Sequence, residues 1–133
     1  MRLPITEPDN FKAVDIAQVE RMVDEFIARG FTYFDTAYMY HDFESERIMR
    51  ETLVKRHPRT AYTLTTKLPV MMIHSDEDQR RIFDEQLEKC GVDYFDYYLL
   101  HSLEDGGNYD AYEKYDCFNW GIEKKKEHSL DDK

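Results

Sequence analysis

The stretch FTYFDTAYMYHDFESE, residues 31–46, opens with aromatic and β-branched residues and then places an aspartate at position 35, where the apolar run ends. Such an opening is typical of a β-strand. Two comparable runs follow, AYTLTTKLP at 61–69 and DYFDYYLLHS at 93–102. Their first strand residues, at positions 31, 61 and 94, lie 30 and 33 residues apart, which is the length of a βα repeat.

Between these runs the sequence has the periodicity of helices. Apolar residues recur every three or four positions across 15–30, where Asp15 is an expected N-cap and Gly30 an expected end. The same reasoning predicts helices over 45–57 and 75–91. Strands that alternate with helices at this period predict an α/β fold with parallel strands.

A chain of 133 residues has the size of one domain, so we expect a single domain over 1–133. Positions 97–100 are all apolar, and we expect this strand to be buried on both faces, as in a sheet covered by helices. The part 104–133 has weaker patterning. It is expected to be weakly structured or helical, with a helix over 118–127 interrupted near Gly121.

The charge balance makes some partners unfavourable. The chain carries 18 Lys and Arg against 28 Asp and Glu, a net charge of −10, and such a surface repels phosphate backbones and anionic headgroups. We therefore expect no nucleic acid and no membrane partner, and the lack of long apolar runs predicts a soluble, cytoplasmic protein. Cys90 and Cys117 lack metal-ligand spacing and are expected to be free thiols.

Four ionisable residues lie at or just after the predicted strand ends: Asp35, Tyr40, Lys67 and His101. In a parallel α/β fold the working groups lie at the carboxyl ends of the strands, so these residues are expected at one face of the molecule. Taken singly, a polar residue at a strand end is more often a solvated loop entry than a catalytic group. The combination of four favours a site.

Such a set suits proton donation to a carbonyl oxygen while a hydride reaches the carbonyl carbon. A tyrosine has an ordinary pKa near 10, so a neighbouring cation is needed to stabilise its phenolate, and Lys67 is the candidate. A carboxylate keeps a partly buried lysine charged, and Asp35 is the candidate for that role. His101 could donate a hydrogen bond that orients the substrate carbonyl.

The segments YFDTAYMY, LTTKLP and QLEKCGVDYFDYYLLHS together resemble the first half of the aldo-keto reductases, over residues 2–103. The resemblance implies a partial (β/α)8 TIM barrel of about four βα units, NADP as cofactor and a small-molecule carbonyl as substrate. It also implies Tyr40 as general acid, Lys67 and Asp35 as its tuning pair, and His101 as the orienting group. Among subgroups, the chain looks closest to bacterial members that often carry a C-terminal iron–sulfur extension, although it has no cysteine cluster for one.

A complete barrel of this kind takes about 250 residues, so this chain is expected to be a truncated domain. In the family, most contacts to the dinucleotide come from the later half of the barrel, and the cofactor-binding residues are therefore unknown.

Two further hypotheses stay open. The chain could be a non-catalytic half-barrel that self-associates as a homo-oligomer through its open sheet edges. The loop residues His41, Asp42, Glu44 and Glu46 could bind a metal, although such loop residues are more often solvated charges.

Overall fold

A three-stranded parallel sheet forms the centre of the protein in the computed structural model, which describes residues 2–104 and 107–130. Its strands are β1 (Tyr33–Asp35), β2 (Thr63–Leu68) and β3 (Tyr97–Leu100), in that spatial order. The expected α/β fold with parallel strands is confirmed. The described residues contain three strands, where the sequence predicted about four βα units.

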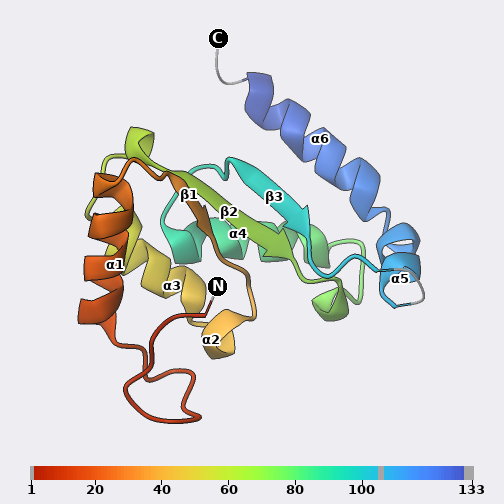
Figure 1. Ribbon diagram of the computed structural model, residues 1–133. Helices are drawn as coiled ribbons and strands as arrows, with labels where there is room; N and C mark the ends of the chain where they lie inside the picture. The colour runs from red at the N-terminus through yellow and green to blue at the C-terminus, as the bar shows by residue number, and fades with distance from the viewer. Residues whose placement is uncertain (1, 105–106, 131–133) are drawn as a thin grey trace.

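Helices precede and follow each strand, as the βα repeat predicts (Figure 1). The helical elements are α1 (Ile16–Ala28), α2 (Tyr40–Phe43), α3 (Ser45–Met49), the π-helical η1 (Arg50–Val54), the short turns η2 (Arg59–Ala61) and η3 (Val70–Met72), α4 (Asp78–Cys90), α5 (Tyr109–Lys114) and α6 (Cys117–Leu130). In Figure 1, α1, α3 and α4 lie along one side of the sheet and α6 lies beyond β3.

Two predicted helix ends, at Asp15 and Gly91, are confirmed, whereas the helix expected from residue 75 begins at Asp78 and the one expected over 45–57 ends at Val54. The Asp15 side chain accepts a hydrogen bond of 2.9 Å from the Gln18 amide and so caps α1. Gly91 ends α4 with a φ of +68°, a left-handed conformation that glycine adopts without steric cost. The space matters there too, because a Cβ on Gly91 would lie only 2.9 Å from Arg50.

The core lies between the sheet and these helices, in two clusters. The first joins α1, α3 and η1 to the start of the sheet, and its buried members are Leu3, Val19, Val23, Phe34, Ile48, Met49, Leu53, Tyr62, Leu64 and Cys90. The second joins α4, α5 and α6 to the other end of the sheet, and its buried members are Tyr38, Leu68, Val70, Ile73, Ile82, Phe83, Tyr112, Cys117 and Trp120. Both cysteines are buried and free, as expected.

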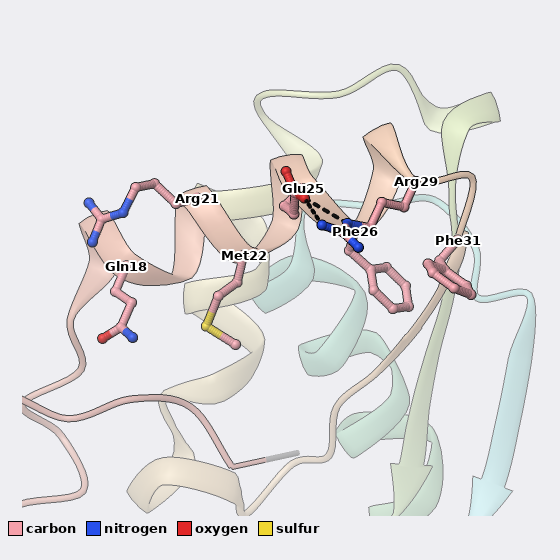
Figure 2. Close-up of a pocket in the computed structure, with 7 residues that line it drawn as sticks. All are labelled: Gln18, Arg21, Met22, Glu25, Phe26, Arg29 and Phe31. Carbon is pink, nitrogen blue, oxygen red and sulfur yellow. Dashed lines mark hydrogen bonds and ion pairs between the residues drawn. The ribbon is translucent and has the colours of Figure 1, made fainter.

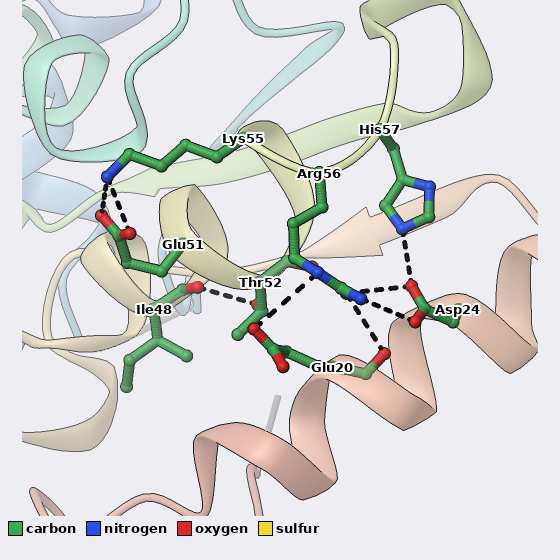
Figure 3. A network of polar contacts seen from close by, with 8 residues as sticks. All are labelled: Glu20, Asp24, Ile48, Glu51, Thr52, Lys55, Arg56 and His57. Atoms are coloured by element: carbon green, nitrogen blue, oxygen red, sulfur yellow. Dashed lines mark hydrogen bonds and ion pairs between the residues drawn. The ribbon is translucent and has the colours of Figure 1, made fainter.

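Polar contacts also tie α1 to the end of η1 at the surface (Figure 3). Arg56 holds Asp24 through two nitrogens, at 2.9 and 2.7 Å, and His57 contacts the same carboxylate at 2.8 Å. Hydrogen bonding from Arg56 lowers the pKa of Asp24. Because these groups are at the surface, the contacts add more to the relative placement of the two helices than to overall stability.

Two expectations about the later part of the chain are wrong. The third strand is not buried on both faces, because Tyr97 and Leu99 are 55% and 40% exposed on the side that carries no helix. The predicted break near Gly121 does not occur, and α6 runs on through this residue. Residues 105–106 and 131–133, part of the segment expected to be weakly structured or helical, lie outside the described residues.

Candidate active site

Strand alternation puts three of the four predicted site residues on the open face of the sheet. The side chains of Phe34, Leu64 and Tyr98 pack into the helix-covered core, so their neighbours along each strand point the other way. Asp35 at the end of β1, Lys67 in β2 and His101 just after β3 share this second orientation. The fourth residue, Tyr40, comes from the loop that follows β1.

Lys67 and Asp35 form the predicted ion pair. Lys67 Nζ lies 2.7 Å from Asp35 Oδ1 and also donates to the Thr36 carbonyl oxygen at 2.8 Å. The lysine side chain is 12% exposed and the aspartate side chain 31%. The ammonium group is thus largely withdrawn from water and held by a carboxylate and a carbonyl, as the sequence reasoning required.

The ring of Tyr40 lies against both Lys67 and His101. Lys67 Nζ is 4.8 Å from the centroid of the Tyr40 ring, which is a cation–π distance. The rings of Tyr40 and His101 meet edge to face, with centroids 5.6 Å apart and an interplanar angle of 88°. The structure therefore brings together all four side chains that the sequence singled out.

The surroundings of His101 lower its pKa. Burial lowers its pKa below the ordinary value of 6.5, and the nearby Lys67 charge lowers it further. Nδ1 of His101 is buried and has no hydrogen-bond partner within the part of the chain that the structure describes. A neutral imidazole is favoured here, and a neutral ring can donate one hydrogen bond to a substrate.

The residues of the alternative metal site do not converge. His41 uses both ring nitrogens on backbone groups, the Leu3 amide at 2.8 Å and the Phe11 carbonyl at 2.9 Å. Glu46 points into the core, and Asp42 lies at the surface within 3.6 Å of Lys12. No group of three or more potential metal ligands occurs among the described residues, and the contacts of His41 and Glu46 give the metal hypothesis no support.

A buried polar network beneath Lys67 was not foreseen from the sequence. Glu46 Oε1 accepts hydrogen bonds of 2.7 Å from both Thr66 Oγ1 and Gln86 Nε2, and Gln86 Nε2 also contacts the Lys67 carbonyl oxygen at 3.1 Å. Tyr98 closes the network by donating to Gln86 Oε1 at 2.6 Å. Burial raises the pKa of Glu46 more than these hydrogen bonds lower it.

The network supports the backbone from which Lys67 projects, on the helix side of the sheet. The sequence held one usable signal for it. Glu46 and Gln86 occupy positions of the predicted helices that face the core, where polar side chains need partners. Which partners they would find depended on the packing of α3 and α4 on β2.

A separate hollow lies on the outer side of α1, away from these residues (Figure 2). It is lined by Gln18, Arg21, Met22, Glu25, Phe26, Arg29 and Phe31. Figure 2 shows the rings of Phe26 and Phe31 next to each other, with Arg29 paired to Glu25 above them. None of the four clustered side chains contributes to this hollow, so it is not the candidate site.

Fold and site together define one part of a (β/α)8 barrel, with a cluster of ionisable side chains at the carboxyl edge of its strands. The chain belongs to the aldo/keto reductase family, whose model matches residues 2–113. The resemblance in the sequence is thus confirmed at the level of the family and of the partial barrel.

Individual relatives agree with this assignment. The chain is 36% identical over 93 residues to 4-dihydromethyl-trisporate dehydrogenase of Mucor mucedo, a match that covers 66% of this chain and 28% of that protein. It is 33% identical over 81 residues to the NAD/NADP-dependent indole-3-acetaldehyde reductase of Schizosaccharomyces pombe, covering 60% of this chain and 26% of that protein. The chain thus spans about a quarter of the length of these curated relatives.

A solved structure shows the same architecture. The aldo-keto reductase from Klebsiella pneumoniae in complex with NADPH superposes with a TM-score of 0.59 at 25% identity, covering 85% of this chain and 40% of that one. Among the described residues, no helix is both long and apolar enough to cross a membrane.

Proposed function

We propose that this chain supplies the proton-donating part of an oxidoreductase that reduces aldehydes or ketones with NADP(H). The observation that carries the proposal is the position of the Tyr40 ring beside both Lys67 and His101. Its centroid lies 4.8 Å from Lys67 Nζ and 5.6 Å from the centroid of the His101 ring. The family assignment supports the reaction class, because the relatives named above are a dehydrogenase and an aldehyde reductase.

In the proposed reaction, Tyr40 donates its phenolic proton to the carbonyl oxygen of the substrate. The negative charge that forms on the phenolate oxygen is stabilised by the Lys67 ammonium group, which Asp35 holds in place at 2.7 Å. His101 donates a hydrogen bond to the same carbonyl and fixes its direction. A proton from water then restores the phenol.

The four side chains fit the substrate end of a nicotinamide cofactor. Among the described residues, the Tyr40 hydroxyl is not engaged in a hydrogen bond, so it remains available to a carbonyl oxygen. NADPH, when bound, would supply the hydride that reaches the carbonyl carbon and would leave as NADP⁺. We assign no residue of this chain to the phosphates of the dinucleotide, because the family resemblance places those contacts in later strands of the family's barrel.

The test is carbonyl-dependent oxidation of NADPH by the wild-type chain and two variants. Tyr40→Phe removes the proton donor and keeps the ring, so the rate should fall by roughly 10² to 10⁴-fold. Tyr38→Phe is the matched control. Tyr38 lies only two residues before Tyr40 in the sequence, but its hydroxyl donates to Glu85 at 2.9 Å, outside the site. If the wild type oxidises NADPH at a measurable rate, an equal rate for Tyr40→Phe would exclude Tyr40 as the proton donor.

A second candidate function is association through the open face of the sheet. Parallel sheets are almost always covered on both faces, yet Tyr33, Tyr97 and Leu99 are 48%, 55% and 40% exposed here. In this reading the chain is a non-catalytic module that forms a homo-oligomer.

Two measurements separate the candidates. A ligand that binds only the native state raises its melting temperature, so a rise with NADPH favours the enzyme. No rise, together with a concentration-dependent increase of mass in light scattering, favours the association module. The fluorescence of Trp120, the single tryptophan, gives an independent signal for binding.

A further inference from the structure

His41 connects the start of the chain to the loop that carries Tyr40. Its ring contacts the backbone of Leu3 and Phe11, which precede it by 38 and 30 residues. We propose that His41 is a positioning residue, whose two hydrogen bonds hold the loop in the conformation that keeps the Tyr40 ring against Lys67 and His101. The proposal deepens the proposed function, since it concerns the placement of the proposed proton donor.

The hydrogen bonds of His41 define a single arrangement of its ring. A peptide N–H can only donate, so Nε2 accepts the 2.8 Å bond from the Leu3 amide. Nδ1 then carries the proton and donates to the Phe11 carbonyl oxygen at 2.9 Å. The residue is 8% exposed, and the Phe11 ring packs edge-on against the imidazole at 6.4 Å. Both ring nitrogens thus form hydrogen bonds in a buried position, and we call this pair of hydrogen bonds the His41 tie.

The loop needs such a tie because its backbone is unfavourable. His41, Asp42 and Phe43 have φ values of +51°, +57° and +71°, and none of them is glycine. Three successive left-handed residues do not persist on local preference alone and require support from their surroundings. Besides the hydrogen bonds from the Glu44 amide to the Tyr40 and His41 carbonyl oxygens, Asp42 contacts Lys12, but this contact is a surface ion pair at 3.6 Å with both side chains more than 60% exposed.

The placement of Tyr40 depends on this backbone. Its hydroxyl has no hydrogen bond within the described part of the chain, so only ring contacts and the main chain fix its direction. His41 is the next residue, and any relaxation of its left-handed conformation rotates the peptide that joins the two. Loss of the tie should therefore withdraw the Tyr40 ring from His101 while the sheet stays folded.

The experiment compares two asparagine variants by NMR. Asparagine tolerates a left-handed backbone, so His41→Asn keeps that tolerance but is too short to bridge Leu3 and Phe11. Asp42→Asn is the matched control at the next left-handed position, and it leaves the tie intact. The readout is the nuclear Overhauser effect between the Tyr40 and His101 rings, assigned with Tyr40→Phe and His101→Gln.

We expect this ring contact to be lost, or reduced several-fold, in His41→Asn and to be retained in Asp42→Asn. A folded His41→Asn with the wild-type contact would overturn the proposal, even if its melting temperature were lower, because a merely structural role would lower stability without moving Tyr40. If His41→Asn does not fold, His41→Phe carries the test, since it keeps a ring against Phe11 and removes both hydrogen bonds. This readout needs no cofactor, so the proposal can fail or hold independently of carbonyl reduction.

Discussion

Replacing Lys67 with methionine tests whether the charge pair at the strand ends is held as tightly as its geometry indicates. The substitution keeps an unbranched side chain of similar length but removes Nζ, which lies 2.7 Å from Asp35 Oδ1 and 2.8 Å from the Thr36 carbonyl oxygen. Asp35 would lose its ammonium partner while its side chain remains only 31% exposed.

The magnitude follows from this burial. Removing one partner of a fully buried ion pair costs about 3–5 kcal/mol of unfolding free energy, because the remaining charge is left poorly solvated. Water reaches part of the Asp35 carboxylate, so we expect a loss of about 2–3 kcal/mol in Lys67→Met. In the double variant Lys67→Met with Asp35→Asn neither charge remains. Its loss of unfolding free energy should therefore be about 2 kcal/mol smaller than the sum of the losses in the two single variants, and this difference is the coupling energy.

Urea unfolding followed by Trp120 fluorescence measures these differences. Trp120 is the only tryptophan, is 9% exposed and packs on Phe83 at 5.7 Å, so its emission reports loss of the core. Lys55→Met is the control, because Lys55 lies 2.6 Å from Glu51 but both side chains are 52% exposed. It should lose no more than about 0.5 kcal/mol. A coupling below about 0.5 kcal/mol would show that Lys67 and Asp35 do not form a tightly held, partly buried ion pair.

Two other substitutions test the surroundings of the site. Burial raises the pKa of Glu46 above its ordinary value of 4.5. The folded state therefore binds a proton at Glu46 more tightly than the unfolded state does. The free energy of unfolding of the wild type should consequently fall as the pH rises from 4.5 through the folded-state pKa. Glu46→Gln should lack this fall, and parallel urea-stability curves against pH would contradict the assignment. At Asp42, with φ +57°, glycine should be about 1 kcal/mol more stable than alanine, because only alanine meets the left-handed penalty; equal melting temperatures would argue against strain in this loop.

The four residues of the candidate site could be named from the sequence because strand periodicity and parallel topology constrain them. Asp35, Lys67 and His101 follow runs of strand-forming residues, and parallel strands direct their carboxyl ends to one edge. Tyr40 was identified as a site residue from its spacing after Asp35 along the sequence, which matches a motif of the family.

The residues that surround the site were not predictable in the same way. His41 looked like a candidate metal ligand, and only the return of the N-terminal segment showed that its ring binds the Leu3 and Phe11 backbone. Glu46 belonged to the same hypothesis, yet the start of α3 turns it inward toward Thr66 and Gln86. In both cases the partner lies 20 or more residues away, so no local pattern could indicate it.

Local sequence is enough to specify the alternation of helices and strands, the caps at Asp15 and Gly91, and the identity of the residues at the strand ends. These features depend on neighbours within a few positions, where backbone preference and side-chain periodicity act directly. Tertiary structure alone decided which face of the sheet stays open and what holds the Tyr40 loop in its left-handed conformation. Those outcomes depend on the packing of distant segments, because burial and hydrogen bonding are satisfied only when the folded chain brings partners together.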